Sequence, residues 1–138
     1  MFAKTMMAAM ALFVMIAVTQ GQEVRQKTFT SPGGTQLRVL VDAASLGGAE
    51  VEVGELTFKP NSDSAEHQHG VTETFYVLEG ELTQVVNGKP IKLAPGMVAS
   101  IRSTDHVIHR AGPNGAKALV IWAPGGEIAR VTARWTAK

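Results

Sequence analysis

From residue 24 onward, hydrophobic and polar positions alternate in short runs that are separated by turn-forming residues. Alternation of this kind places every second side chain on the same face and is typical of strands with one buried face. The runs predict strands at 27–30, 36–41, 51–58, 73–78, 81–86, 89–93, 97–101, 106–111 and 116–122. A last strand or short helix is expected at 127–135. So many short, evenly spaced strands predict an all-β sandwich or closed barrel.

Three segments add detail to this pattern. Strand 73–78 carries apolar residues on both faces, which is typical of a strand inside a layered or barrel structure. Asn87-Gly88 lies between strands 81–86 and 89–93 and is a strong signal for a two-residue hairpin turn. Residues 43–49, which include two adjacent glycines, are expected to form a loop.

The first 21 residues differ from the rest and are interpreted as a signal peptide. Lys4 supplies a short positive region, and residues 5–18 form an apolar run of fourteen residues, which suits a signal segment and is short for a membrane span. Cleavage after Thr19 or after Gly21 would place a small residue at the exit position. We therefore expect residues 22–138 to form a single domain that is periplasmic or secreted and has no membrane contact after cleavage.

Composition excludes several classes of function. The 138 residues suffice for one domain with a core, and the absence of cysteine rules out disulfides, thiolate metal sites and cysteine nucleophiles. The net charge is +1, and no basic run or stripe is present, which argues against nucleic acid as a partner. No glycine-rich phosphate loop or nucleophile elbow occurs, so no organic cofactor is expected and the catalytic residues stay unassigned.

The chemistry is concentrated in the segment HQHGVTETFYVLEG at residues 67–80. His67 and His69 are two residues apart, so they project from the same face of an extended chain. Glu73 returns to that face if the chain stays roughly extended beyond Gly70. Two imidazoles and one carboxylate that converge on a point are three ligands for a divalent metal.

The same residues resemble the conserved motifs of the cupin superfamily. HQHGVTE, followed by six residues and Gly80, resembles the first cupin motif, in which two histidines and a glutamate bind metal. The Pro95-Gly96 turn followed by His106 or His109 resembles the second motif, which supplies a fourth ligand. The resemblance covers nearly all of residues 22–138. It implies a double-stranded β-helix, or jelly-roll barrel, with a metal inside.

The identity of the fourth ligand stays open between His106 and His109, because the turn at 102–104 departs from the Pro-x-Gly of the family motif. The two histidines are three residues apart, so a regular strand points them to opposite faces. The distance to Pro124 favours His106 slightly. The apolar residues Val107 and Ile108 before His109 favour His109.

The resemblance implies one divalent transition metal, either Fe, Mn, Ni, Cu or Zn, with open coordination positions for a small-molecule substrate or ligand. One expected function is an oxygenase-type enzyme that acts on a small organic substrate. The alternative is a small-molecule-binding or sensing protein without turnover, and a third reading is a structural zinc site. A homodimer is expected at the level of the family.

Overall fold

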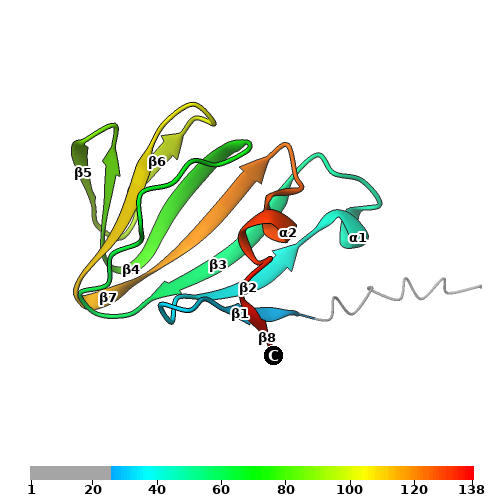
Figure 1. Cartoon of the computed structure of the whole chain (residues 1–138), viewed down its shortest axis with the longest axis horizontal. Coiled ribbons are helices and arrows are strands. Elements are labelled where there is room, and N and C mark those ends of the chain that lie inside the picture. Colours follow the sequence, from blue (N-terminus) through cyan, green and yellow to red (C-terminus); the bar gives the residue numbers. More distant parts are fainter. Residues whose placement is uncertain (1–25) are drawn as a thin grey trace, which may run out of the picture.

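The computed structural model describes residues 26–138, which are almost entirely β (Figure 1). The strands are β1 (Thr28–Thr30), β2 (Gln36–Val41), β3 (Glu52–Phe58), β4 (Thr72–Val86), β5 (Lys89–Leu93), β6 (Val98–Ile101), β7 (Val107–Ala123) and β8 (Thr136–Ala137). The short helices α1 (Ala43–Leu46) and α2 (Glu127–Val131) accompany them, and neither has the length needed to cross a membrane. The predicted signal segment, residues 1–21, lies outside the described residues.

The strands form an antiparallel sheet in the order β5-β4-β7-β3-β2-β1-β8, with β6 paired to β4. Strands β4 and β7 are the longest and pair along their whole length, from Thr72 opposite Ala123 to Val86 opposite Val107. Both strands bend midway, so the β5–β6 end and the β1–β2 end diverge as two arms of a curved sheet (Figure 1). The arrangement is a jelly-roll barrel and confirms the expected all-β class.

The core lies between these two arms and is built from alternate residues of the strands. On β4, Phe75 and Val77 are fully buried, whereas Tyr76 between them is 41% exposed. The strand lies in the barrel, as expected, but its outer face is exposed at Tyr76, where no layer of the described chain covers it. The other fully buried large side chains include Leu37, Leu82, Leu93, Ile101, Val107, Val120 and Trp122.

Several predicted boundaries are corrected by the structure. The segments 73–78 and 81–86 are one continuous strand, β4, and the segments 106–111 and 116–122 are one continuous strand, β7. The register of β4 and β7 shifts between the pairs Gly80–Ala116 and Leu82–Ala111. Residues 112–115, which separate the two predicted strands, therefore form a bulge in β7 opposite the single residue 81 of β4. The expected loop at 43–49 contains α1, whose first turn is closed by Asp42 and Ser45 in a reciprocal capping box. Segment 127–135 begins as a helix.

The bend in β4 requires glycine at position 80. Gly80 has a φ of 74°, and a Cβ atom there would lie 2.1 Å from the carbonyl oxygen of Gly115. We predict that Gly80→Ala lowers the free energy of unfolding by more than the roughly 1–2 kcal/mol that a left-handed alanine costs, because the clash is with backbone. Urea unfolding followed by circular dichroism measures this.

Gly88 is the matched control for this prediction. Its φ is 79°, but nothing lies within 4 Å of a Cβ built there. Gly88→Ala should therefore cost only the roughly 1–2 kcal/mol of the left-handed backbone conformation. Equal losses in the two variants would show that the close approach of β4 to β7 is not what demands Gly80.

Candidate metal centre

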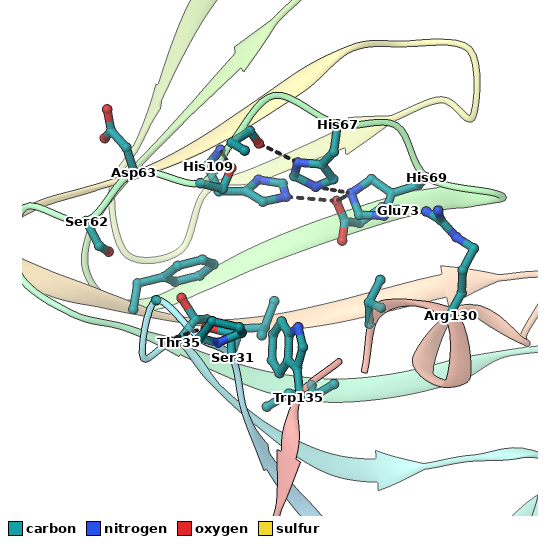
Figure 2. A pocket seen from close by; sticks show the side chains of 18 of the residues that line it. Ser31, Thr35, Ser62, Asp63, His67, His69, Glu73, His109, Arg130 and Trp135 are labelled. Carbon is teal, nitrogen blue, oxygen red and sulfur yellow. Dashed lines mark hydrogen bonds and ion pairs between the residues drawn. The ribbon is translucent and has the colours of Figure 1, made fainter. Parts of the chain in front are cut away.

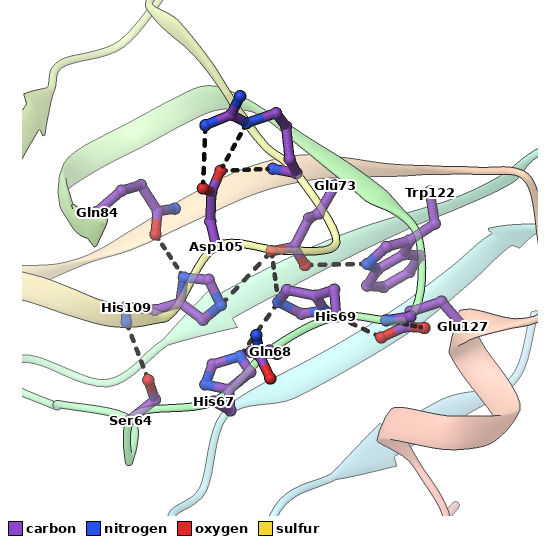
Figure 3. A network of polar contacts seen from close by, with 12 residues as sticks. Ser64, His67, Gln68, His69, Glu73, Gln84, Asp105, His109, Trp122 and Glu127 are labelled. Atoms are coloured by element: carbon purple, nitrogen blue, oxygen red, sulfur yellow. Dashed lines mark hydrogen bonds and ion pairs between the residues drawn. The ribbon is translucent and has the colours of Figure 1, made fainter. Parts of the chain in front are cut away.

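Four side chains from three segments meet inside the barrel (Figure 3). His67 is fixed by a β-bridge to Val107, with backbone hydrogen bonds of 2.9 and 3.0 Å in the two directions. His69 follows two residues later, Glu73 lies on β4, and His109 lies on β7. β4 and β7 are hydrogen-bonded neighbours, so the bridge at Val107 brings the histidine segment over the strand pair that carries the other two groups.

The inward atoms lie at the separations expected for ligands of one metal ion. Nε2 of His69 is 3.1 Å from Nε2 of His67 and 2.7 Å from Oε2 of Glu73. Nε2 of His109 is 3.6 Å from the same oxygen. Metal bonds of about 2.1 Å place neighbouring ligand atoms about 3.0 Å apart in an octahedron and about 3.4 Å apart in a tetrahedron. The ligand atoms of the three imidazoles all lie within 4.8 Å of one another, close enough to share one metal ion.

Hydrogen bonds at Nδ1 orient His67 and His109. Nδ1 of His67 donates to the carbonyl oxygen of Ala65 at 2.8 Å. Nδ1 of His109 donates to Oε1 of Gln84 at 2.5 Å. A proton on Nδ1 leaves the lone pair of Nε2 free, so both rings present a metal-binding nitrogen to the interior.

His69 is oriented in the same way by a carboxylate. Its Nδ1 lies 3.0 Å from Oε1 of Glu127, a residue of α2. When Nδ1 carries the proton in each neutral ring, the Nε2 atoms of His67 and His69, 3.1 Å apart, are both acceptors. Two acceptors held this close need a cation between them, which is either a second proton on His69 or a metal ion.

Glu73 completes the donor set. Its side chain is 1% exposed, and Oε1 accepts a hydrogen bond of 2.9 Å from Nε1 of Trp122. Among residues 26–138, Oε2 has no hydrogen-bond partner, although Nε2 of His69 lies 2.7 Å away, because the geometry of that approach is not that of a hydrogen bond. A buried carboxylate oxygen without a partner is costly unless a cation binds it, so Glu73 fits a metal ion.

Burial and charge act differently on the three imidazoles. Burial, assisted by the charges of His67 and His69, holds the pKa of His109 well below its usual value. Burial also lowers the pKa of His67, despite the hydrogen bond to Ala65. Burial opposes protonation of His69 as well, but Glu73 and Glu127 outweigh it and raise the pKa of His69. His67 and His109 are therefore neutral, as metal ligands must be, near neutral pH.

The structure brings His67, His69, Glu73 and His109 together and leaves His106 outside. His106 has a side chain that is 55% exposed, and its Nδ1 lies 3.9 Å from a carboxylate oxygen of Glu66 at the surface. The slight preference for His106 is therefore corrected. One residue, His106, separates the turn at residues 102–105 from β7, so Val107 and His109 face inward and His106 faces outward.

Two supporting residues were missed by the sequence analysis. Gln84 is fully buried, and its polar side chain in the inward-facing alternation of β4 after Leu82 is a signal that could have marked it. Glu127 is also buried, but it lies 58 residues beyond His69. Its contact with His69 depends on how α2 packs on the barrel, which no local pattern encodes.

The turn before β7 is held by Asp105, whose carboxylate accepts hydrogen bonds of 2.9 Å from the backbone of Arg102 and the side chain of Asn87. Hydrogen bonds from the Arg102 backbone first, then from Asn87, lower the pKa of Asp105 from 3.8 to about 2. Because the pKa of this carboxyl is lower in the folded state than in the unfolded state, its ionised form stabilises the fold at pH values above the unfolded-state pKa. This stabilisation is lost as the pH falls through the folded-state pKa.

We predict that Asp105→Asn lowers the urea midpoint of unfolding at neutral pH, because the ionised carboxylate is lost. The difference from the wild type should shrink as the pH falls below 3.8 and vanish near 2. Urea titrations across this range measure it. If the difference in urea midpoint between Asp105→Asn and the wild type stayed constant down to the lowest pH, the charge of Asp105 would not stabilise the turn.

A cavity of about 490 Å³ opens onto the four side chains (Figure 2). His67, His69, Glu73 and His109 form one wall, and Trp135 lies on the opposite wall. The remaining lining is mainly apolar, with a few hydroxyl groups, one carboxylate, one amide and one guanidinium. It includes Ser31, Thr35, Leu37, Leu56, Phe58, Ser62, Asp63, Gln68, Arg130 and Val131. The cavity leaves room for a small molecule beside these four side chains.

Comparisons with known proteins agree with this architecture. A family model described as a cupin domain matches residues 54–122, half of the chain. An RmlC-like cupin from Shewanella frigidimarina has a similar structure, with a TM-score of 0.62, 20% identity, and coverage of 72% of this chain and 86% of the other. KdgF from a Halomonas species is also similar, with a TM-score of 0.59, 17% identity, and coverage of 68% of this chain and 81% of the other.

A third similar structure is the polyketide cyclase RemF from Streptomyces resistomycificus. It has a TM-score of 0.58 and 26% identity, and the match covers 64% of each chain. No match is found among curated proteins.

Proposed function

Because the chain belongs to the cupin superfamily, we propose that it is an exported metal-binding protein that acts on a small organic molecule. One observation carries the proposal: three imidazole nitrogens and a carboxylate oxygen without a hydrogen-bond partner converge on one wall of a cavity. In this proposal His67, His69, Glu73 and His109 hold the metal.

The donor set suits a divalent transition metal. Three imidazoles and one carboxylate, with no sulfur, are compatible with Fe, Mn, Ni, Cu or Zn. Such a metal, when bound, supplies Lewis-acid chemistry and, for a redox-active ion, electron transfer. The chain itself supplies orientation: Trp122 holds Glu73 through its indole N–H, and Gln84 holds His109 through its amide oxygen.

The cavity supports a small organic ligand. Its volume of about 490 Å³ lies within the roughly 300–1,000 Å³ of small-molecule sites, and such sites combine apolar walls with a few polar groups. Phe58, Leu56 and Trp135 offer apolar surface, while the exposed part of Arg130 offers charge. The ligand would lie between Trp135 and the metal wall.

Two functions remain in competition at this site. Among the described residues that line the cavity, Asp63 is paired with Arg110 and Arg130 with Glu127, so no unpaired carboxylate outside the metal set is poised as a general base. This observation favours chemistry at the metal itself, of the oxygenase type, or binding without turnover as the second candidate. RemF is named a polyketide cyclase, so a similar barrel also serves a further kind of reaction.

Oxygen uptake and calorimetry separate the two candidates. Protein loaded with each of the five metals would be mixed with chelating probes, catechol and acetylacetone, under air. Uptake of O₂ that depends on the metal and disappears in His109→Ala supports the oxygenase, whereas calorimetric binding without uptake supports the binding protein. Absence of both uptake and binding with every metal would contradict a function on small chelating ligands.

Export and a homodimer also remain part of this proposal. Export is supported by the apolar run at residues 5–18, and cell fractionation of the full-length chain tests it.

A dimer is supported by exposed apolar residues on the outer face: Tyr76, 41% exposed, pairs across strands with Val98, 57% exposed. Light scattering of the purified protein measures the mass in solution, and a monomer would contradict the dimer.

A further inference from the structure

The helix α2, which follows the barrel, contacts three consecutive residues of the histidine segment. Glu127 accepts from Nδ1 of His69 at 3.0 Å through Oε1 and from the backbone N–H of Gly70 at 3.1 Å through Oε2. Arg130, one turn later, donates to the carbonyl oxygen of Gln68 at 2.7 Å. One acid and one base of a single helical turn therefore hold residues 68–70. Figure 3 shows Glu127 beside His69.

The two helix residues also hold each other. Nε of Arg130 lies 3.0 Å from both carboxylate oxygens of Glu127, and its Nη2 contacts Oε1 as well. The Glu127 side chain is 2% exposed. Both of its oxygens face N–H donors, from the guanidinium of Arg130 and from the backbone of Gly70, which is the environment of a carboxylate. A carboxylate can only accept, which selects the Nδ1–H form of His69.

Gly70 leaves room for this contact. A Cβ atom at position 70 would lie 3.1 Å from Oε2 of Glu127 and 3.6 Å from Nε of Arg130. A side chain there would push the carboxylate away from His69. The glycine that follows the second histidine thus permits the close approach of the helix.

The position of α2 is set by contacts away from the metal centre. The buried carboxylate of Glu52, on β3, accepts from the backbone N–H of Ile128 at 2.8 Å. The backbone N–H of Gly125 donates to the carbonyl oxygen of Ala49 at 2.8 Å. The helix is therefore attached to the barrel through residues that touch none of the four proposed ligands, and Glu127 projects from this fixed base.

We propose that Glu127 is a positioning residue that orients His69 for metal binding, so that metal affinity depends on the C-terminal helix. The inference rests on the proposed metal site. A carboxylate that accepts from the outer nitrogen of a ligating imidazole fixes the ring and increases the basicity of the inner nitrogen, and losing such a partner weakens metal binding by about 10- to 100-fold. Nothing in the two cupin motifs includes this residue, since it lies beyond both.

The test compares Zn²⁺ affinity, measured by competition with a chromophoric chelator, in the wild type, Glu127→Gln and Glu52→Gln. Glu52→Gln is the matched control, because it alters a buried carboxylate that holds the same helix without touching His69. We expect Glu127→Gln to bind Zn²⁺ about 10- to 100-fold more weakly and Glu52→Gln to stay close to the wild type. The visible spectrum of the Co²⁺-loaded protein should change in Glu127→Gln only.

Three results would count against the proposal or its premise. Wild-type affinity in Glu127→Gln overturns the role of Glu127, and equal losses in both variants show that only the attachment of α2 matters. A wild type that binds neither Zn²⁺ nor Co²⁺ contradicts the metal site itself, which is a separate failure. If Glu127→Gln does not fold, Gly70→Ala replaces it, and a weaker Zn²⁺ affinity is expected because the new methyl group displaces the carboxylate of Glu127. Unchanged affinity in Gly70→Ala then overturns the proposal.

Discussion

Replacing His109 with alanine should strip the purified protein of its metal, whereas replacing His106 should leave the metal content unchanged. His109 is 7% exposed and directs Nε2 toward the carboxylate of Glu73, while His106 faces solvent. Loss of one imidazole leaves only His67, His69 and Glu73 to hold the ion. Elemental analysis of protein purified without chelators should find about one transition metal per chain in the wild type and close to none in His109→Ala.

His106→Ala is a control of the same residue type, three positions away on the outer side of the turn. Circular dichroism of both variants distinguishes loss of metal from loss of the fold. Loss of the metal in His106→Ala with retention in His109→Ala would return the fourth ligand to His106 and contradict the register of β7 described above.

Glu73→Gln should abolish the stabilisation that metal gives the fold without destabilising the metal-free protein. Oε1 of the amide can still accept from Trp122. Among residues 26–138 the replaced oxygen has no hydrogen-bond partner, so the metal-free protein loses no hydrogen bond there. Wild-type protein should gain about 4 kcal/mol at a free metal concentration 1,000 times its Kd. The variant should gain almost nothing, because the charge that neutralises the ion is gone.

Thermal unfolding without Zn²⁺ measures the stability of the metal-free protein, and unfolding with Zn²⁺ measures the stabilisation that the metal adds. Glu79→Gln is a control at an exposed glutamate of the same strand, whose ion pair with Lys117 lies at the surface. The control should respond to Zn²⁺ like the wild type. A Zn²⁺-induced rise in Tm that survives in Glu73→Gln would show that this carboxylate does not bind the ion.

The proposed ligands that are close in sequence could be predicted from their own segment. His67 and His69 are two residues apart and project to one side, while Glu73, which follows a bend at residues 70–71, was identified by its spacing in the family motif. The hairpin at Asn87-Gly88 and strand β2 follow from equally local rules, and the structure confirms both. These predictions needed no knowledge of distant contacts.

The fourth ligand could not be predicted in this way, because its direction depends on the residue at which β7 begins. A shift of one residue in the turn at 102–105 exchanges the faces of His106 and His109. The family motif left both histidines open as the fourth ligand, and the bridge between His67 and Val107 fixes the register in the structure. Glu127 is a further case, since only the packing of α2 brings it to His69.

The most direct test of the metal site is an anomalous difference map from a crystal soaked in a transition metal, measured at the absorption edge of that metal. The account predicts a single strong peak within about 2.0–2.2 Å of Nε2 of His67, His69 and His109 and of a carboxylate oxygen of Glu73. A peak instead at the exposed pair of His106 and Glu66, or no peak inside the barrel, would contradict it.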